Sequence, residues 1–396
     1  MSTDMSDSSQ LFKNLKVLEL ASVLAGPSVG QFFAEIGAEV IKVENPITKG
    51  DVTRSWRIIG ENEDDNSAYF SCINWGKKSI ALDISQQEGL NILYSLVERA
   101  DIVVTSYKPG DDVKFGVGYG SLKQHNPKII YGQITGYGSD VDKVGYDAII
   151  QAEAGFMMIN GEPDSEPLKM PVALIDILAG HQLKEAILLS YIKVLQTGEG
   201  SKVEVSLIDA GIASLANQAS NYLKVGIEPK KQGSAHPNIA PYGETYTTAD
   251  NKRVMLAVGN NKQFKALCEV LNLPGNPQYS ENSARVENRK SLNSLLTTEI
   301  GKYNAQELID LLNIRKVPVG LVNEVSDAIG AYAKNIGLFR QGKLEGIRTY
   351  IEKGSKSSHI LPPPKYGEHT MEILENTLGI SADDIAEMAK KGVLDL

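Results

Sequence analysis

The first 140 or so residues of the chain alternate between short β-rich runs and helical patterns. In residues 15–45 the β-rich run LKVLEL is followed by helical spacing in VGQFFAEIGA and then by a second β-rich run, EVIKVE. Strands that are separated by helices, and not by tight turns, pair in parallel and are covered on both faces. The alternation therefore predicts an α/β fold with a doubly wound, mostly parallel sheet, the Rossmann-like architecture.

The connection after the first predicted strand is the first place to look for a ligand. It reads SVLAGPS and lacks the GxGxxG pattern, so a dinucleotide-binding fingerprint is absent. In open α/β sheets, however, ligands bind beyond the carboxyl ends of the strands. The turn Val23–Ser28 is therefore expected to lie at the binding edge of the sheet.

The chain is long enough for more than one domain, since it has 396 residues. We place the large domain at 10–200 and a smaller α+β domain at 225–325, where proline-punctuated sequence leads into a hairpin pattern around Ala249–Asn251. Alternation resumes over 327–396. Near the end, Ser381 followed by Asp384 is typical of a capping box that opens a last helix.

Composition limits the classes of function. The net charge of -9 argues against a basic surface for nucleic acid or for an anionic membrane. The only two cysteines, Cys72 and Cys268, lie far apart and without metal-ligand spacing, which is typical of a reducing compartment. The N-terminal MSTDMSDSSQ has no apolar core, and no stretch is apolar for long enough to span a membrane. We therefore expect a cytoplasmic protein.

One carboxylate, Asp176, interrupts the apolar run VALIDIL directly before a helical pattern over 177–194. An ionised carboxylate in apolar surroundings is costly unless something satisfies it. Aspartate is a favoured N-cap, so a capping role is one interpretation. The other is a nucleophile held ionised by the helix N-terminus and shielded from water. The local pattern leaves both open.

Other chemical signatures are few. The five histidines have no metal-ligand spacing, and neither a GxSxG elbow nor a Walker motif occurs. Basic residues next to predicted strands are more informative as a group, although each one alone is more often a surface charge. Near one edge of a sheet they would suit a phosphorylated ligand in an acidic protein. These residues are Arg54, Lys77, Lys78, Lys108 and Lys114.

The order and spacing of six segments resemble one known family over nearly the whole chain. The segments are ASVLAGP, GAEVIKVENP with GDVTRSW, NWGKKSIALD, GYDAIIQAEAGFM, VALIDILAG and GEHTMEIL. They are similar to the class III CoA-transferases, the family that includes formyl-CoA transferase, carnitine CoA-transferase and α-methylacyl-CoA racemase.

The resemblance implies a role for several residues. It makes Asp176 the catalytic aspartate and lays the turn Val23, Leu24 and Ala25 along CoA. It implies a homodimer of interlocked subunits, and a large domain to which the C-terminal part returns. CoA or acyl-CoA is then a substrate, a small carboxylic acid is the other, and no metal is required. The residues that it places near the CoA phosphates or the adenine are Lys108, Lys114, Arg54 and Lys78. Tyr137 falls where the transferases have an active-site tyrosine, and we expect Gly136 beside it to belong to the CoA site as well.

Departures from the family bear on the substrate. Leu24 stands where formyl-CoA transferases have glutamine, and KKQGSAHP replaces their glycine run, which argues against formyl or oxalyl specificity. Asn45 replaces a basic residue that some members use on CoA. Tyr146 occupies the place of the racemases' histidine, and a tyrosine is a poor proton shuttle near neutral pH.

The resemblance favours CoA transfer from an acyl-CoA to a carboxylate through an aspartyl intermediate on Asp176. Backbone N–H groups near Gly136 are candidates to stabilise the oxyanion. Two alternatives stay open. One is an acyl-CoA racemase or epimerase with Asp176 as a base, and the other is a non-catalytic CoA-binding protein.

Overall fold

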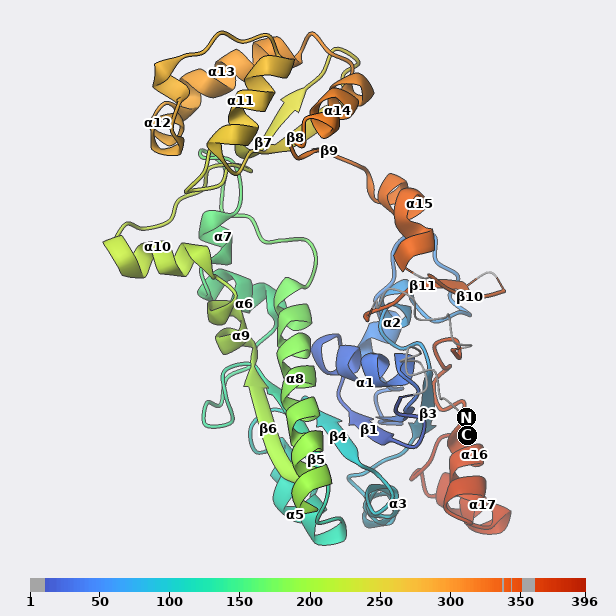
Figure 1. Cartoon of the computed structure of the whole chain (residues 1–396). Coiled ribbons are helices and arrows are strands. Elements are labelled where there is room, and N and C mark those ends of the chain that lie inside the picture. Colours follow the sequence, from blue (N-terminus) through green and yellow to red (C-terminus); the bar gives the residue numbers. More distant parts are fainter. Residues whose placement is uncertain (1–10, 337, 343, 351–359) are drawn as a thin grey trace. The chain divides into compact units, whose positions relative to one another are not determined.

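The computed structural model describes residues 11–336, 338–342, 344–350 and 360–396 (Figure 1). The chain divides into two units. Unit 1 comprises Met1–Ala154, Pro171–Ala216 and Ala333–Leu396, and unit 2 comprises Gly155–Met170 and Asn217–Tyr332. The short segment 155–170 thus leaves the large unit, although the sequence pattern assigned it there.

Unit 1 is built on a six-stranded sheet in which every neighbouring pair is parallel. The strand order is β3-β2-β1-β4-β5-β6, so consecutive strands run outward from β1 in one direction and then from β4 in the other. This order confirms the predicted doubly wound sheet and puts the switch point between β1 and β4. The strands are β1 (Lys16–Leu20), β2 (Glu39–Glu44), β3 (Lys77–Ala81), β4 (Ile102–Thr105), β5 (Ile130–Thr135) and β6 (Ser201–Ser206).

Helices cover both faces of this sheet, as the alternation predicted. On one face, α1 (Ala25–Glu35) packs against α8 (Leu174–Thr197), and α8 also lies along β5 and β6. On the other face, leucines and isoleucines of α3 (Gln87–Val97), α5 (Tyr119–His125) and α17 (Ala382–Lys390) form one buried cluster with side chains of β1 to β5. The remaining helices of this unit are η2 (Val52–Ser55), α2 (Ala68–Ser71), α4 (Asp111–Lys114), α6 (Asp147–Glu153), α9 (Leu207–Ala213), α16 (Thr370–Glu372) and η4 (Ile373–Thr377).

The C-terminal part of unit 1 differs from the strand–helix alternation that we expected there. Its strands β10 (Leu338–Gln341) and β11 (Leu344–Ile347) pair only with each other, as an antiparallel hairpin. Among the described residues after 333, no strand joins the parallel sheet. The last helix follows the sequence prediction, because the Ser381 hydroxyl accepts a hydrogen bond from the Asp384 N–H.

Unit 2 is smaller and mixes helices with an antiparallel sheet of β7 (Tyr242–Thr247), β8 (Arg253–Ala257) and β9 (Val319–Leu321). The expected hairpin is present, since β7 and β8 pair across Thr247 and Arg253. One face of this sheet packs on helices around a leucine-rich core. The helices are α7 (Phe156–Ile159), α10 (Asn217–Val225), α11 (Asn261–Val270), η3 (Pro277–Tyr279), α12 (Asn282–Glu287), α13 (Arg289–Ile300) and α14 (Ala305–Ile314). Helix α15 (Val325–Ile336) then leads back to unit 1 in the sequence.

Of the helices in the described residues, none combines the length and the apolarity that a membrane crossing demands.

Candidate active site

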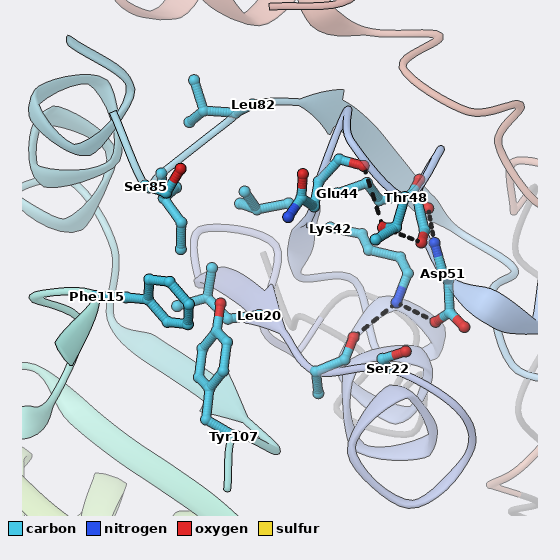
Figure 2. Close-up of a pocket in the computed structure, with 15 residues that line it drawn as sticks. Leu20, Ser22, Lys42, Glu44, Thr48, Asp51, Leu82, Ser85, Tyr107 and Phe115 are labelled. Atoms are coloured by element: carbon cyan, nitrogen blue, oxygen red, sulfur yellow. Dashed lines mark hydrogen bonds and ion pairs between the residues drawn. The ribbon is translucent and has the colours of Figure 1, made fainter. Parts of the chain in front are cut away.

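Two pockets lie side by side at the carboxyl edge of the parallel sheet, and both belong to unit 1. The first, the Asp176 pocket, is formed by residues that follow β1, β4 and β5 together with the start of α8. The second, the Phe115 pocket, is formed by residues at the ends of β1, β2, β3 and β4 (Figure 2). Ser22 and Tyr107 line both pockets, so one extended ligand can occupy the two together.

Asp176 lies in the first turn of α8 and is 7% exposed. The N-cap of that helix is Ala173, so the interpretation of Asp176 as the cap was wrong. Among the residues that the structure describes, Asp147 takes the capping role from α6, because its carboxylate accepts a hydrogen bond from the Ile175 N–H at 2.7 Å. Asp176 is therefore free to face the pocket.

The environment of Asp176 disfavours its charge. Burial, followed by the nearby carboxylate of Asp147, raises the pKa of Asp176 to about 7. Within the described part of the chain, no hydrogen bond to the Asp176 carboxylate is found. A carboxylate that is poorly solvated and not engaged by donors is a more reactive nucleophile than one in water.

One wall of the Asp176 pocket comes from the turn after β1. Val23, Leu24 and Ala25 all line the Asp176 pocket, as the resemblance implied. Val23 has a φ of 74°, a left-handed conformation that β-branched residues rarely adopt. The adjacent Gly26 is needed for packing, since a Cβ there would lie 2.3 Å from the Cβ of Ala21.

A second wall comes from the loop after β5, where two backbone segments approach closely. A Cβ on Gly136 would lie 2.6 Å from the backbone nitrogen of Gly145, so side chains are excluded at both positions. Gly136, Lys143 and Tyr146 line the pocket. Tyr137 does not: its hydroxyl donates to Glu153 at 2.7 Å, and Lys143 lies over its ring.

The Phe115 pocket has one apolar and one charged side (Figure 2). Leu82, Tyr107 and Phe115 form the apolar side, and burial raises the pKa of the Tyr107 hydroxyl to about 12, so this tyrosine stays neutral. On the charged side the ammonium of Lys42 lies 2.8 Å from the Asp51 carboxylate and is already neutralised. Such a pocket suits a flat heterocycle with hydroxyl groups better than it suits a bare anion.

The predicted basic residues are only partly brought together. Lys108 lines the Asp176 pocket, whereas Lys114 is exposed next to Phe115 and lines neither pocket. Lys78 is the second residue of β3, toward the opposite end of the strand from the pockets, and pairs with Glu39 and Glu372. Its expected place at the ligand edge is therefore not supported.

Arg54 and Lys77 form ion pairs with buried carboxylates of the large unit. Arg54 makes a paired hydrogen bond with the buried Glu44 and contacts the Pro364 carbonyl oxygen, and it lines neither pocket. Lys77 is fully buried and bonds to Glu19 at 2.7 Å. Both were expected to face a phosphate and instead neutralise carboxylates inside the protein.

Sequence reasoning missed several residues of the site. Lys143, Phe115 and Tyr107 line the pockets but lie in loops or turns without a distinctive pattern. Burial and then the charge of Asp176 raise the pKa of the Tyr69 hydroxyl to about 12, so this tyrosine, which lines neither pocket, stays neutral. The ring of Tyr69 meets Trp56 edge to face at 5.1 Å. The only signal was that Trp56 lies in a long polar loop, which is often functional.

No group of three or more histidine, cysteine, aspartate or glutamate side chains among the described residues is arranged to hold a metal ion. The reactive group that the site offers is the buried carboxylate of Asp176, which lines a pocket with the turns that follow β1 and β5. This pocket adjoins the Phe115 pocket, which suits a flat ring, and two lysines, Lys108 and Lys143, line the Asp176 pocket.

The comparison with family models is decisive, because the model of CoA-transferase family III matches residues 12–370. The chain belongs to CoA-transferase family III. It is 38% identical to a succinate–glutarate CoA-transferase of Agrobacterium fabrum, over 94% of this chain and 97% of the relative. It is 33% identical to a human succinyl-CoA:glutarate CoA-transferase, over 97% of this chain and 90% of the relative.

Among solved structures, a CAIB/BAIF family protein from Brucella suis matches with a TM-score of 0.80 and 38% identity, over 93% of this chain and 99% of that one. The predicted α/β fold and family are thus confirmed. The protein is a CoA-transferase, an enzyme that moves CoA between an acyl-CoA and a carboxylic acid. This activity is favoured over the racemase and over the non-catalytic alternative.

Proposed function

We propose that CoA transfer proceeds through covalent intermediates on Asp176. The observation that carries the proposal is the place of this carboxylate: it lines the groove, is 7% exposed and has no hydrogen-bond donor among the described residues. Nucleophilic catalysis divides a difficult exchange between two acids into easier acyl transfers. A carboxylate oxygen is a competent nucleophile only when ionised, and the pKa of about 7 leaves a large ionised fraction at neutral pH.

The steps follow from the chemistry of thioesters. An oxygen of Asp176 attacks the thioester carbonyl, the carbon–sulfur bond breaks, and the CoA thiolate leaves behind a mixed anhydride. The thiolate then attacks the Asp176 carbonyl, which forms an aspartyl-CoA thioester and releases the donor acid. The acceptor carboxylate attacks that thioester in turn, and the thiolate completes the exchange by attacking the acceptor's carbonyl. Backbone N–H groups near Gly136 are the candidates to stabilise each oxyanion.

CoA itself is proposed to span both pockets. Its adenine would lie against Tyr107 and Phe115, and its pantetheine arm would run past Ser22 and Val23 to Asp176. The residues shared by the two pockets support this path. Lys108, with Lys114 on the exposed rim, would then meet the phosphates between the two ends.

For the acids, we propose short dicarboxylates. Support comes from relatives named for succinate, glutarate and mesaconate. A second carboxylate needs a cation, and the lysines that line the Asp176 pocket are Lys108 and Lys143. With Lys108 assigned to CoA, Lys143 is the partner for the remote carboxylate. It is held beside the pocket by Glu153, at 2.7 Å.

The proposed working form is a homodimer in the cytoplasm. Leu189, Ile192 and Leu195 of α8 are 69%, 51% and 69% exposed in the single chain, and an interface would cover such a stripe. Both cysteines are free thiols, which suits a reducing compartment. Equilibrium sedimentation tests the assembly, and a folded, stable monomer would contradict it.

Succinyl-CoA and isotopically labelled glutarate provide the test of the reaction. Mass spectrometry should detect labelled glutaryl-CoA with the wild type and none with Asp176→Asn, while CoA still binds both proteins in calorimetry. Asp384→Asn is the matched control, because Asp384 also lies in the first turn of its helix but is exposed. An active Asp176→Asn variant would refute the nucleophile. Deuterium uptake at the α-carbon without CoA exchange would instead identify a racemase.

A further inference from the structure

The turn that lines the Asp176 pocket contains a backbone conformation that its own sequence disfavours. Val23 has a φ of 74°, and a β-branched side chain in this region crowds the backbone. Such conformations persist only where the surrounding structure imposes them, and they concentrate at functional sites. The turn therefore depends on contacts from elsewhere in the protein.

Asp51 supplies the contact on one side of the turn. Both of its carboxylate oxygens accept from the Val23 N–H, at 3.3 and 3.4 Å. Asp51 is itself fixed, because it also accepts from the backbone N–H and the hydroxyl of Thr53 at 3.0 and 2.8 Å. Burial acts to raise its pKa, but Lys42 and Thr53 lower the pKa of Asp51 to about 2, so it stays a charged acceptor.

Lys42 holds the other side of the same turn. Its ammonium donates to the Ala21 carbonyl oxygen at 2.8 Å and lies 2.8 Å from Asp51 (Figure 2). The third partner is Glu19, at 3.0 Å. One buried ion pair therefore hydrogen-bonds the backbone on both sides of Ser22: the Lys42 ammonium at residue 21 and the Asp51 carboxylate at residue 23.

The stability of the fold does not by itself explain the Lys42–Asp51 ion pair. The side chains of Lys42 and Asp51 are each 1% exposed, and removing two charges from water offsets much of their attraction. A packed apolar pair would be expected to stabilise the fold at least as well. Directed hydrogen bonds to the two sides of the turn are what apolar side chains cannot provide.

We propose that Lys42 and Asp51 are positioning residues for CoA transfer, which hold Val23 in its left-handed conformation so that the backbone of residues 23–25 presents the groove for the thioester. The inference rests on the proposed path of CoA along this turn. Without Asp51, Val23 relaxes toward a negative φ, which rotates the peptide that follows and closes or reshapes the groove.

Replacing Val23 by glycine tests whether the Lys42–Asp51 pair acts as a clamp, that is, whether it holds the backbone of residues 21–23 in place for CoA or only stabilises the fold. Glycine adopts positive φ without steric cost, so the turn should no longer need Asp51. Asp51→Ala should weaken CoA binding about tenfold in the Val23 protein, which corresponds to the lower range of such strain. In the Val23→Gly background the same substitution should cost about twofold or less. A tenfold loss in both backgrounds would overturn the proposal.

The control is Asn251→Gly, which relieves another left-handed residue, with a φ of 57°, in a turn of unit 2. It should leave the penalty of Asp51→Ala unchanged. Calorimetry with CoA alone reads the turn directly, so its outcome does not depend on whether Asp176 forms an adduct. Should Asp51→Ala fail to fold, Asp51→Asn is the second variant, since it keeps only one acceptor oxygen and loses the attraction of Lys42. Any loss of CoA affinity that Asp51→Asn causes should disappear in the Val23→Gly background, and a loss of the same size in both backgrounds refutes the proposal.

Kinetics with an acyl-CoA donor provide a second readout. A positioning role predicts that Asp51→Ala raises the KM for the donor and also lowers kcat, because the carbonyl is presented less well to Asp176. The KM for the carboxylic acid should change little. An effect confined to the melting temperature would show that the ion pair serves the fold only.

Discussion

Replacing Asp176 by asparagine should stabilise the protein at alkaline pH while abolishing transfer. Burial and the charge of Asp147 raise the pKa of Asp176 from 3.8 to about 7 in the folded state. Between these two values the native protein binds a proton that the unfolded chain does not. The stability that this proton contributes is fully present below pH 3.8 and is lost as the pH rises through 7. Asparagine does not titrate, so the variant does not lose this part of its free energy of unfolding as the pH rises.

The size of the effect follows from the shift. The pKa changes by about three units, and each unit corresponds to about 1.36 kcal/mol, so the ionised carboxylate costs up to about 4 kcal/mol at high pH. Part of that cost is already present at pH 5. The advantage of the variant should therefore be about 3 kcal/mol larger at pH 8 than at pH 5.

Urea unfolding of the wild type, Asp176→Asn and Asp384→Asn at pH 5 and pH 8 measures this difference. The exposed Asp384 occupies the same turn of its own helix and serves as the control, with little change expected between the two pH values. If Asp176→Asn is no more stable than the wild type at pH 8, or if its advantage does not depend on pH, the account of the buried carboxylate is wrong.

Three further predictions test other parts of the site. The kcat/KM for acyl-CoA should fall below a pH of about 7 as Asp176 becomes protonated, and Asp147→Asn should move that limb to lower pH, as a pH–rate profile would reveal. Arg54→Met should destabilise the protein by about 3 kcal/mol in urea, because Glu44 is left buried without its cation. Lys143→Ala should raise the KM for a dicarboxylate about tenfold and hardly change that for a monocarboxylate in steady-state kinetics; equal changes would exclude the lysine as the recognition group.

The fold was predictable because its signal is local. Apolar runs and helical periodicity located the strands of the parallel sheet, and β2 has the bounds of the run EVIKVE. The start of α8 was missed for the opposite reason. That helix begins at Leu174 because Asp147 caps it, and this cap comes from another helix, 28 residues before the N–H that it accepts from. A pattern confined to neighbouring residues does not contain such a contact.

The sequence predicted the pocket-lining residues correctly only where they directly follow strands of the parallel sheet. The turn Val23–Ala25, Lys108 and Gly136 all follow strands and line the Asp176 pocket. Lys78 was misplaced because charge next to a strand does not reveal which end of the strand it occupies. Its partner Glu372 is 294 residues away, so no local pattern indicated that the ammonium is already neutralised.

Aromatic lining residues were missed because a loop aromatic looks the same whether it fills a core or a binding pocket. Phe115 packs against the main core cluster and lines its pocket as well. Tyr137 was chosen and Tyr146 lines the pocket instead, since the close approach of Gly136 and Gly145 brings the second tyrosine to the groove. Only the tertiary contact between two glycines separates these two candidates.

The most direct test of the central claim is to trap the enzyme during turnover with acyl-CoA and to analyse the peptide that spans Pro171–Lys184. Hydroxylamine or borohydride should modify one side chain in that peptide, Asp176, in the wild type and not in a sample without acyl-CoA. Turnover with an unmodified Asp176, or an adduct on a different residue, would contradict the aspartyl mechanism.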